Sequence, residues 1–532
     1  MNIPLFQKFL SLFTGMILLF NLPSTWHGKA ANNTSSIDAY IEEQMRRLDI
    51  PGIAIVIVKD AQIQFVRGYG IADPSGRSVT PQTPFLAASL SKSITAVGIM
   101  QLVEEGKIRL EDPIQKHLPW FRVNDPAASS QITVRHLLHH ISGFSEREGY
   151  MRNLEIDSGE QALENSLRRL SQSELRNVPG TEFEYSNTNY DLLGLLIQNI
   201  SEKPYKVYIQ EKIFTPMGMI NSFTSLEEAR DHGLAIGYTS FFGLTIPYDG
   251  WMPYSQTVIP SAGLFLSAED LGKYLIFHLN NGKLADGEQI LSPEGVVQLH
   301  SPGIEISDNV FYSMGLTQFS FTQAVSPEDA DLSPPLALAH GGEWANYRAL
   351  MVLVPERDLG IGMLINKNDS RRGSEYDQIG WNLTLMTMGL KPIEFPSNED
   401  FLTRYGHIIG GILVILLFLS MIWSISELRK ISIFPPTARQ IKQHTILFFV
   451  ILPHIDLLIA SYLLLIEIES MQGLLLDIAF LPDAGVVFIF LLFLTIAWGI
   501  TRTFLAILIN RRMRLNLTRK LTINQSVSAG GE

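Results

Sequence analysis

Runs of apolar residues near both ends of residues 37–395 predict β-strands that meet in one sheet. The segment "PGIAIVIVKDAQIQFVRGYG" holds two β-rich runs joined at Lys59-Asp60-Ala61, which is typical of a hairpin. Much later, "RALMVLVPERDLGIGMLIN" holds two more runs around a turn at Pro355–Asp358. Strands at both ends of this region, with helices between them, predict an antiparallel sheet assembled from both termini of an α+β domain.

Helical spacing of apolar residues dominates between those strands. The stretches predicted as helices are "SKSITAVGIMQLVEEGK", "TVRHLLHHIS" and "NYDLLGLLIQNISEK". No internal repeat interrupts this order. We therefore predict a single domain over 37–395.

The composition changes abruptly beyond Asp400. Apolar spans at 407–425, 445–468 and 485–509 each have about the length that crosses a bilayer. They predict a C-terminal bundle of three transmembrane helices within 405–510, followed by a basic tail at 511–532.

Charges around the spans predict one orientation. The loop after the first span is basic, the loop after the second is acidic and has no Lys or Arg, and the tail is basic. Because basic loops favour the cytoplasm, the spans fit an out–in–out–in path, with the large domain outside the cytoplasm and the tail inside. The residues that carry this pattern are Arg429, Lys430, Arg439 and Lys442 in the first loop, Glu467, Glu469, Asp477 and Asp483 in the second, and Arg511, Arg512, Arg514, Arg519 and Lys520 in the tail.

Residues 1–30 have the pattern of a signal peptide or an N-terminal anchor. One lysine precedes an apolar run, and Gly28-Lys29-Ala30 supplies a small-residue cleavage pattern. Both alternatives carry the following chain out of the cytoplasm, which agrees with the orientation inferred from the loop charges.

Composition then excludes several function classes. The net charge of −12 gives no electrostatic support for a nucleic-acid partner. The chain has no cysteine, so disulfides, thiolate nucleophiles and cysteine-ligated metals are impossible. Mean hydropathy is high, +0.14, because apolar residues are concentrated at the C-terminus.

The segment "FLAASLSK" contains the one Ser-x-x-Lys in the chain, Ser89 and Lys92. Three residues apart on a helix, the two side chains share a face, and a neutral lysine amine can take a proton from the serine hydroxyl. Burial or cationic neighbours can keep that amine neutral, and helix amides can stabilise an oxyanion. The alternative is an ordinary helix start with a solvated lysine, which the apolar surroundings disfavour.

Two further stretches carry polar groups of the same chemistry. Tyr185-Ser186-Asn187 is the one Tyr-x-Asn in the chain, where a tyrosine could shuttle a proton and an asparagine could bind an amide carbonyl. The alternative is a buried tyrosine on a turn. His340-Gly341-Gly342 precedes a predicted strand, where glycines allow a substrate backbone to approach. Its alternative is a plain hairpin entry.

These stretches together resemble the serine β-lactamase and penicillin-binding protein family, in its class C β-lactamase and D,D-peptidase branch. "LVEEGKIRLEDPIQKHLP", "ITVRHLLHHISGF", "PGTEFEYSNTNYDLLGLLI", "IFTPMGM" and "SAGLFLSAEDLGKYL" are similar to segments of that family in the same order. The resemblance covers roughly residues 37–370. It implies an antiparallel sheet flanked by helices together with an all-helical region.

The resemblance also implies roles for individual residues. Ser89 would be the acylated nucleophile, Lys92 its proton acceptor and Tyr185 the proton shuttle, by double displacement. Asn187, His340, Gly341 and Gly342 would bind substrate, and the amides of Ser89 and Glu343 would form the oxyanion hole. No cofactor and no metal is implied.

The third motif departs from the family pattern. His340 stands where β-lactamases usually have a lysine, and Glu343 adds a negative charge nearby. A histidine is a weaker fixed positive charge at neutral pH, so the anchor for a substrate carboxylate is weakened. This favours an esterase, amidase or peptidase over an efficient β-lactamase.

Other groups of polar residues in the chain do not match known site motifs. His136, His139 and His140 lack the Glu of a zincin, since Leu137 follows the first of them. The chain has no Gly-x-Ser-x-Gly elbow and no Walker or dinucleotide glycine motif. Ionisable groups in the predicted spans, His454, Asp456 and Arg502, are either functional or a packing salt bridge of the anchor, and we favour the packing role.

The function expected from the sequence is a membrane-anchored, extracytoplasmic serine hydrolase that acts on small-molecule or peptide substrates of the cell envelope. Its partners are such a substrate and a lipid bilayer, with no nucleic acid. A second hypothesis is a sensor of β-lactams or peptidoglycan fragments, or a penicillin-binding protein, acylated without efficient turnover. A non-catalytic envelope protein is the third, and the intact Ser89, Lys92 and Tyr185 argue against it.

Overall fold

Two compact units divide the chain, Met1–Glu43 and Gln44–Glu532. The described part of the first unit is the beginning of helix α2 (Asn33–Leu48). The computed structural model describes residues 33–393, apart from 156, 158, 160, 249–253, 285 and 321–334, and separate positions between 405 and 426 and between 480 and 511.

The predicted membrane segments fall largely outside these residues. Residues 1–30 and the span 445–468, with His454 and Asp456, lie outside the described part of the chain, as does Arg502. The spans 407–425 and 485–509 are described at some of their positions. In the described residues no helix combines the length and the apolar character needed to cross a membrane. The transmembrane bundle and the signal peptide therefore stay predictions.

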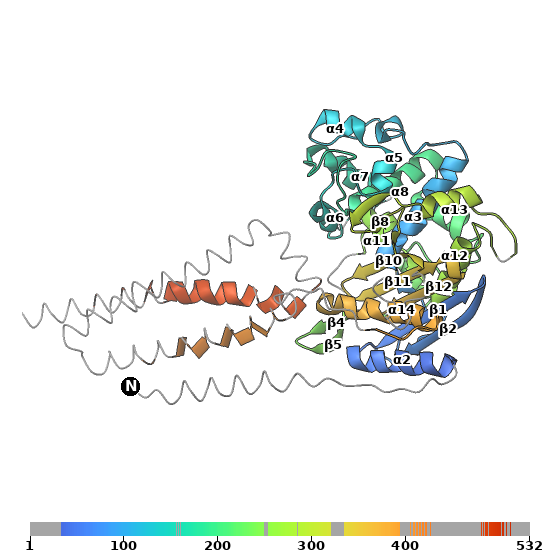
Figure 1. Ribbon diagram of the computed structural model, residues 1–532. Coiled ribbons are helices and arrows are strands. Elements are labelled where there is room, and N and C mark those ends of the chain that lie inside the picture. The colour runs from blue at the N-terminus through green and yellow to red at the C-terminus, as the bar shows by residue number, and fades with distance from the viewer. Residues whose placement is uncertain are drawn as a thin grey trace, which may run out of the picture. The chain divides into compact units, whose positions relative to one another are not determined.

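An antiparallel sheet of eight strands dominates the described part of the domain (Figure 1). β1 pairs with β2 on one side and with β12 on the other, with Ile53 opposite Ile365. The predicted sheet built from both sequence ends, with both hairpins, is therefore confirmed. Its order is β2-β1-β12-β11-β10-β9-β8-β7, with bounds β1 (Gly52–Lys59), β2 (Gln62–Gly70), β7 (Ile304–Ser307), β8 (Val310–Tyr312), β9 (Thr317–Ser320), β10 (Leu336–Trp344), β11 (Tyr347–Val354) and β12 (Leu359–Ile365).

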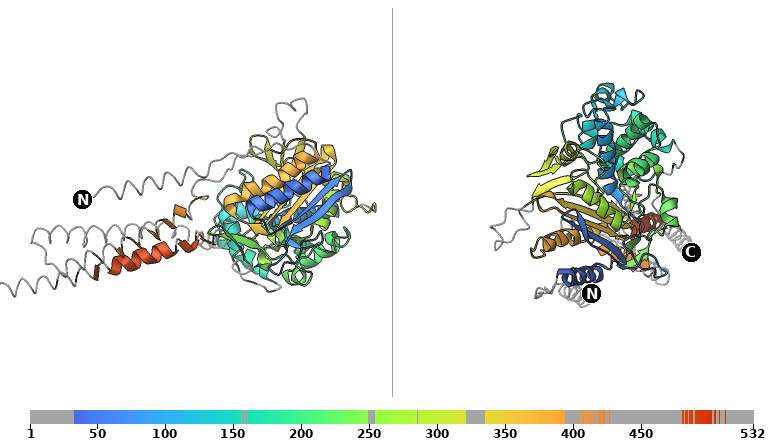
Figure 2. Two further views of the ribbon diagram at one scale, coloured as in Figure 1. Left: turned by 90° about the horizontal axis from the view of Figure 1, so that it is seen from below. Right: turned by 90° about the vertical axis from the view of Figure 1, so that its right-hand side faces the viewer.

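Helices cover both faces of the sheet at close range. On one face, α12 (Ala268–Leu279) lies so near β12 that a Cβ added at Gly362 would be 2.6 Å from Leu271. On the other face is α14 (Gly373–Thr387), where a Cβ at Gly380 would be 2.5 Å from Leu350. The left view of Figure 2 shows α14 lying in front of the strands. The two glycines thus set how closely these helices approach the sheet.

A helical region lies beyond the sheet, as the family resemblance implies. Figure 1 and the right view of Figure 2 both show helices α4 to α8 gathered away from β1 and β2. The helices that build this region and its neighbourhood are α3 (Ser91–Glu104), α4 (Pro126–Gln131), α5 (Val134–Leu138), α6 (Glu146–Arg152), α7 (Ala162–Arg168), α8 (Asn187–Ser201), α9 (Tyr205–Ile209), α10 (Leu226–Asp231), α11 (Ile259–Ala262) and α13 (Pro293–His300).

Helices α3 and α8 form the centre of this region and are buried over most of their length. Both follow the predictions closely, whereas the predicted helix "TVRHLLHHIS" is shorter. It ends at Leu138, and His140 has a positive φ of 56°. Short strands complete the domain: β3 (Phe85–Leu86) pairs with β6 (Phe265–Leu266), and β4 (Tyr238–Phe241) joins β5 (Leu244–Pro247) and β13 (Lys367–Asn368).

Candidate active site

Ser89 lies on a tight turn between β3 and α3. Its predecessor Ala88 has a positive φ of 46°, a region that residues with a Cβ rarely occupy. Both residues belong to a short 3-10 helix (Ala88–Leu90), and α3 begins at Ser91. Ser91 fixes this turn, because its Oγ donates to Ala88 O at 2.7 Å and accepts from Leu264 N at 3.1 Å. The motif thus crosses from the 3-10 helix into α3 rather than lying on one α-helix.

Lys92 is fully buried and has three polar partners. Its Nζ lies 3.1 Å from Ser89 Oγ, 2.7 Å from Asn187 Oδ1 and 2.9 Å from the carbonyl of Ser261. Burial lowers the pKa of Lys92 to about 7, although Asp191 acts in the opposite direction. The alternative of a solvated lysine is therefore wrong.

The three partners of Lys92 fit both of its protonation states. An ammonium group donates three hydrogen bonds, one to each neighbour. A neutral amine donates two, to the acceptor-only oxygens of Asn187 and Ser261, and its lone pair is left for the hydroxyl of Ser89. When Lys92 changes from ammonium to amine, only the hydroxyl hydrogen of Ser89 has to rotate toward the lone pair. The neutral amine can therefore accept the serine proton.

Tyr185 approaches the same oxygen from the other side. Its hydroxyl donates to Ser89 Oγ at 3.0 Å. Burial raises the pKa of Tyr185 well above its usual value, and Tyr312 and Tyr150 raise it further. The phenol is therefore protonated at neutral pH, so it can relay or donate a proton but does not serve as a standing phenolate base.

The ring of His140 packs against the ring of Tyr185. Their rings lie 4.5 Å apart, and His140 Nδ1 accepts a hydrogen bond from Ser186 N at 3.1 Å. Burial, with Lys92 and His340, holds the pKa of His140 well below its usual value, so the ring is neutral. In the described residues no group of three His, Asp or Glu side chains could hold a metal ion.

His340 is the middle residue of β10, and the strand then passes the turn that carries Ser89. Its Nδ1 donates to Gly341 O at 2.6 Å, and its Nε2 accepts from Tyr312 OH at 3.2 Å. Burial, with Lys92, lowers the pKa of His340 to about 4. The side chain is thus uncharged at neutral pH, a stronger departure from lysine than the sequence suggested.

The two glycines after His340 differ in their surroundings. A Cβ at Gly342 would lie 2.1 Å from the carbonyl oxygen of Ala87, whereas the nearest atom to a Cβ at Gly341 is 4.0 Å away. The expectation of close backbone approach therefore applies to Gly342, but the approaching backbone is the chain's own. A substrate contact at Gly341 stays a prediction.

Glu343 is partly exposed and tied into an ion-pair network. Arg348 lies 2.9 Å from its carboxylate, and Asn368 and Ser370 donate to it at 3.1 and 2.8 Å. Burial acts to raise the pKa of Glu343, but Arg348 and these two donors hold it below its usual value. Arg348 also lies 2.7 Å from Asp377, so one guanidinium is shared by two carboxylates, an arrangement that the sequence did not indicate.

Asn187 begins α8 and is nearly buried. Its Oδ1 accepts from Lys92, and its Nδ2 donates to Asn153 Oδ1 at 3.2 Å. The structure therefore places it as a partner of Lys92. A contact with substrate stays a prediction.

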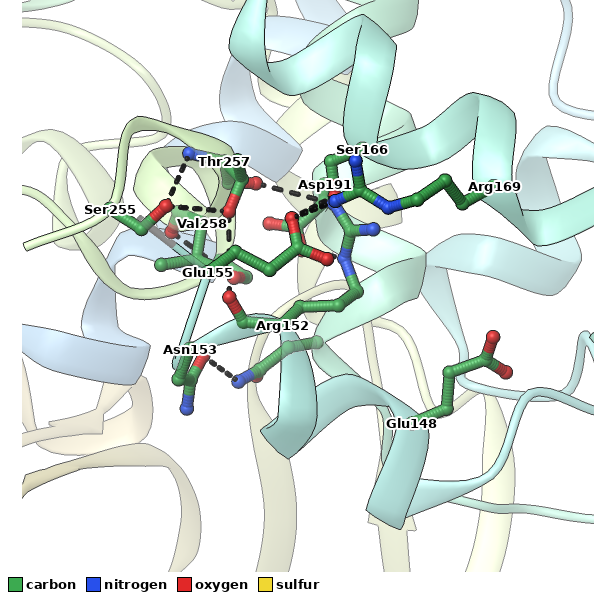
Figure 3. Close-up of polar contacts among 12 residues, drawn as sticks. Glu148, Arg152, Asn153, Glu155, Ser166, Arg169, Asp191, Ser255, Thr257 and Val258 are labelled. Carbon is green, nitrogen blue, oxygen red and sulfur yellow. Dashed lines mark hydrogen bonds and ion pairs between the residues drawn. The ribbon is translucent and has the colours of Figure 1, made fainter. Parts of the chain in front are cut away.

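Sequence reasoning missed three residues behind this site: Arg152, Asn153 and Asp191. Figure 3 shows Arg152 extending to Asp191, with 3.1 Å between Nε and Oδ2. Burial raises the pKa of Asp191 to about 6, although Arg152 opposes this. One signal was available, because Asp191 lies four residues after Asn187, on the same face of the helix.

Two known proteins illustrate what this chain is similar to in sequence. Protein flp of Staphylococcus aureus strain COL is 31% identical over 346 residues, 65% of this chain and 64% of that protein. The match thus spans slightly less than two thirds of that relative's length. Penicillin-binding protein 4 of Amycolatopsis lactamdurans is 26% identical over 244 residues, 46% of this chain and 63% of that protein.

Solved structures show the same fold. The octameric penicillin-binding protein homologue from Pyrococcus abyssi superposes with a TM-score of 0.56 and 26% identity, covering 68% of this chain and 78% of that one. A class C β-lactamase superposes with a TM-score of 0.56 and 19% identity, covering 67% and 98%. The family model described as Beta-lactamase matches residues 37–383, and the chain belongs to that family.

Proposed function

We propose that this protein is a serine hydrolase that works through an acyl-enzyme on Ser89. One observation carries the proposal: Ser89 Oγ lies within hydrogen-bond distance of both a buried lysine amine and a buried phenol, Lys92 Nζ and Tyr185 OH. A nucleophile flanked by a base and a proton relay is what acyl transfer requires.

The reaction follows from these positions. Neutral Lys92 takes the Ser89 proton while Oγ attacks the substrate carbonyl, and the oxyanion is stabilised by the backbone amides of Ser89 and Glu343. Tyr185 passes a proton to the leaving amine or alcohol as the bond to the acyl carbon breaks. Water or another acceptor, deprotonated through the same groups, then attacks the acyl carbon and releases Ser89.

The substrate class follows from the third motif. Burial lowers the pKa of His340 to about 4, and Glu343 is paired with Arg348, so these residues supply no free cation for a substrate carboxylate. This favours esters, amides or peptides of the cell envelope over efficient hydrolysis of penicillins.

We further propose that the domain lies outside the cytoplasm and is anchored by the C-terminal spans. The loop charges support this orientation. A contact in the described residues also supports it: Asp483, from the acidic loop, binds Arg371 of the domain at 2.8 Å. This contact supports a loop and a domain on the same side of the membrane.

The test is labelling of the full-length protein in membranes with a fluorescent fluorophosphonate or β-lactam. We expect labelling of the wild type and of Ser130→Ala, an exposed serine, and none of Ser89→Ala. Equal labelling of Ser89→Ala would overturn the proposal.

Turnover of p-nitrophenyl esters, D-amino-acid peptides and nitrocefin then distinguishes the candidate activities. Ester or peptide turnover with slow nitrocefin hydrolysis is expected. Stoichiometric labelling that persists without turnover of any substrate would instead favour the sensor or a slowly deacylating penicillin-binding protein.

A further inference from the structure

Two residues near the C-terminus contact the catalytic domain. The ring of Phe480 lies edge-to-face against Tyr150 of α6, with 6.5 Å between centroids, a favourable aromatic geometry. Asp483 accepts hydrogen bonds from Arg371 Nη1 at 2.8 Å and from Phe242 N at 3.0 Å. We call Phe480 and Asp483 the C-terminal dock.

The dock has the character of an interior contact. Asp483 is fully buried, Arg371 is 5% exposed, and Phe480 packs against the main hydrophobic core. Arg371 also holds Asp369, at 2.7 Å, so a guanidinium joins a carboxylate of the domain to one of the C-terminal segment. A buried charge with two hydrogen-bonded partners fixes position, because loss of either partner leaves a desolvated group.

The partner of Phe480 belongs to the helix that supports Lys92. Within α6 and its cap, Tyr150 meets Phe480, and Asn153 accepts from Asn187. Arg152 of the same helix binds Asp191 (Figure 3). The helix also presses on the backbone at the start of α8, since a Cβ at Gly149 would lie 2.5 Å from Asn187 N. A shift of α6 therefore moves Asn187.

The opposite side of α6 has free volume. A cavity of about 430 Å³ borders the helix, lined by Glu148, Met151, Arg152, Leu154, Glu155, Ser166, Arg169, Leu170 and Ser173. A helix beside such a space can move at low cost, unlike one in a fully packed interior. The contact with Phe480 therefore limits how far α6 can move into this cavity.

We propose that the C-terminal dock holds α6 against the start of α8, so that Asn153 keeps the amide of Asn187 turned toward Lys92 for reaction with Ser89. Phe480 and Asn153 are then positioning residues, and the C-terminal segment contributes to the geometry of the active site. This inference rests on the proposed function, in which Lys92 is the proton acceptor.

A pH profile detects this role because Asn187 touches the group that titrates. The titratable groups around Lys92 come from every neighbouring element: Tyr185 before α8, Tyr190 and Asp191 within it, His140 after α5 and His340 in β10. Substitution of Phe480 or Asn153 keeps all of these groups, whereas Arg152, which lies 3.1 Å from Asp191, belongs to α6 and moves with it. When the Asn187 oxygen turns away, the ammonium form of Lys92 loses more than the amine, so acylation acquires an acid limb at lower pH.

The experiment measures the rate constant for acylation of Ser89 by a p-nitrophenyl ester from pH 5 to 9, with the full-length protein in membranes. We expect Phe480→Ala and Asn153→Ala each to lower the plateau about 10-fold and to move the acid limb to lower pH. Phe480→Tyr should restore both, and Val486→Ala, an exposed position of the same segment, should behave as wild type. In the double variant the two losses should not multiply, because they act through one helix.

Several results would overturn the inference. One is an unchanged profile in Phe480→Ala, and another is a loss that multiplies with that of Asn153→Ala. The proposed function fails on a different result, labelling that does not depend on Ser89.

Discussion

The carbonyl oxygen of Ala87 faces the α-carbon of Gly342 so closely that an added Cβ would lie 2.1 Å from it. This contact joins β10 to the turn that carries Ser89, two residues further on. The third motif and the nucleophile are therefore held together by backbone packing as well as by side chains.

Gly342→Ala should force β10 and this turn apart. We expect a loss of about 1–3 kcal/mol in the free energy of unfolding, typical of overpacking, and a large fall in acylation rate. Gly341→Ala is the matched control, because its Cβ would have no neighbour nearer than 4.0 Å. Urea unfolding and fluorophosphonate labelling test both, and equal effects of the two substitutions would contradict the packing argument.

The acylation rate should rise with pH and level off above an acid limb near pH 7. Lys92 must be neutral to accept the Ser89 proton, and its pKa is about 7. Asp191→Asn removes a charge that raises the pKa of Lys92, so the limb should move to lower pH. Stopped-flow acylation from pH 5 to 9 measures it, with the exposed Asp286→Asn as control. A limb that stays in place would mean that Lys92 is not the titrating group.

Sequence alone predicted the elements that depend on local pattern. The hairpins at Lys59–Ala61 and Pro355–Asp358 and an antiparallel sheet built from both ends of the domain are confirmed. The structure also brings together Ser89, Lys92 and Tyr185, which lie up to 96 residues apart in the chain. Their roles stay predictions, since geometry alone does not show reaction.

Long-range polar contacts could not be read from the sequence. Nothing in the pattern of "EREGYMRN" distinguishes Arg152 and Asn153 from surface residues, because their partners Asp191 and Asn187 lie more than thirty residues away. The loss of charge at His340 likewise depends on burial, which is a property of the folded chain. The pairing of Glu343 with Arg348 also forms only in the folded chain.

His340→Lys should shift preference toward substrates that carry a carboxylate. The wild-type side chain is neutral at pH 7, whereas a lysine supplies a cation at the same place on β10. We expect nitrocefin hydrolysis to improve about 10-fold relative to a neutral p-nitrophenyl ester, or about 1.4 kcal/mol. His340→Gln, which adds no charge, should leave the ratio unchanged. If the ratio of nitrocefin to ester hydrolysis changes equally in both variants, the charge of the side chain is not the cause.

Arg152→Leu should destabilise the fold strongly. It would leave the carboxylate of Asp191 buried without its guanidinium partner, at a cost of about 3–5 kcal/mol. Lys107→Leu, in the exposed pair with Glu105, should cost no more than about 1 kcal/mol. Urea unfolding of the two variants gives the comparison. Similar losses would mean that solvent reaches Asp191.

Folding stability should fall on acidification from pH 6.5 toward pH 4 because several histidines are buried in the neutral form. Burial lowers the pKa of His139, His300 and His340 to about 4, below the value of about 6.5 in an unfolded chain. In that window the unfolded chain binds more protons than the folded one, so protonation favours unfolding. Each group contributes up to about 2 kcal/mol between pH 6.5 and pH 5.

Urea unfolding at pH 7.5 and 5.0 should show this loss reduced in His300→Gln but not in His232→Gln, an exposed histidine. Because His300 contacts His278 at 3.0 Å and none of the proposed catalytic residues, its substitution should leave Ser89 labelling at pH 7.5 intact. If the wild type, His300→Gln and His232→Gln lose the same free energy of unfolding between pH 7.5 and 5.0, the acid sensitivity comes from carboxylates instead.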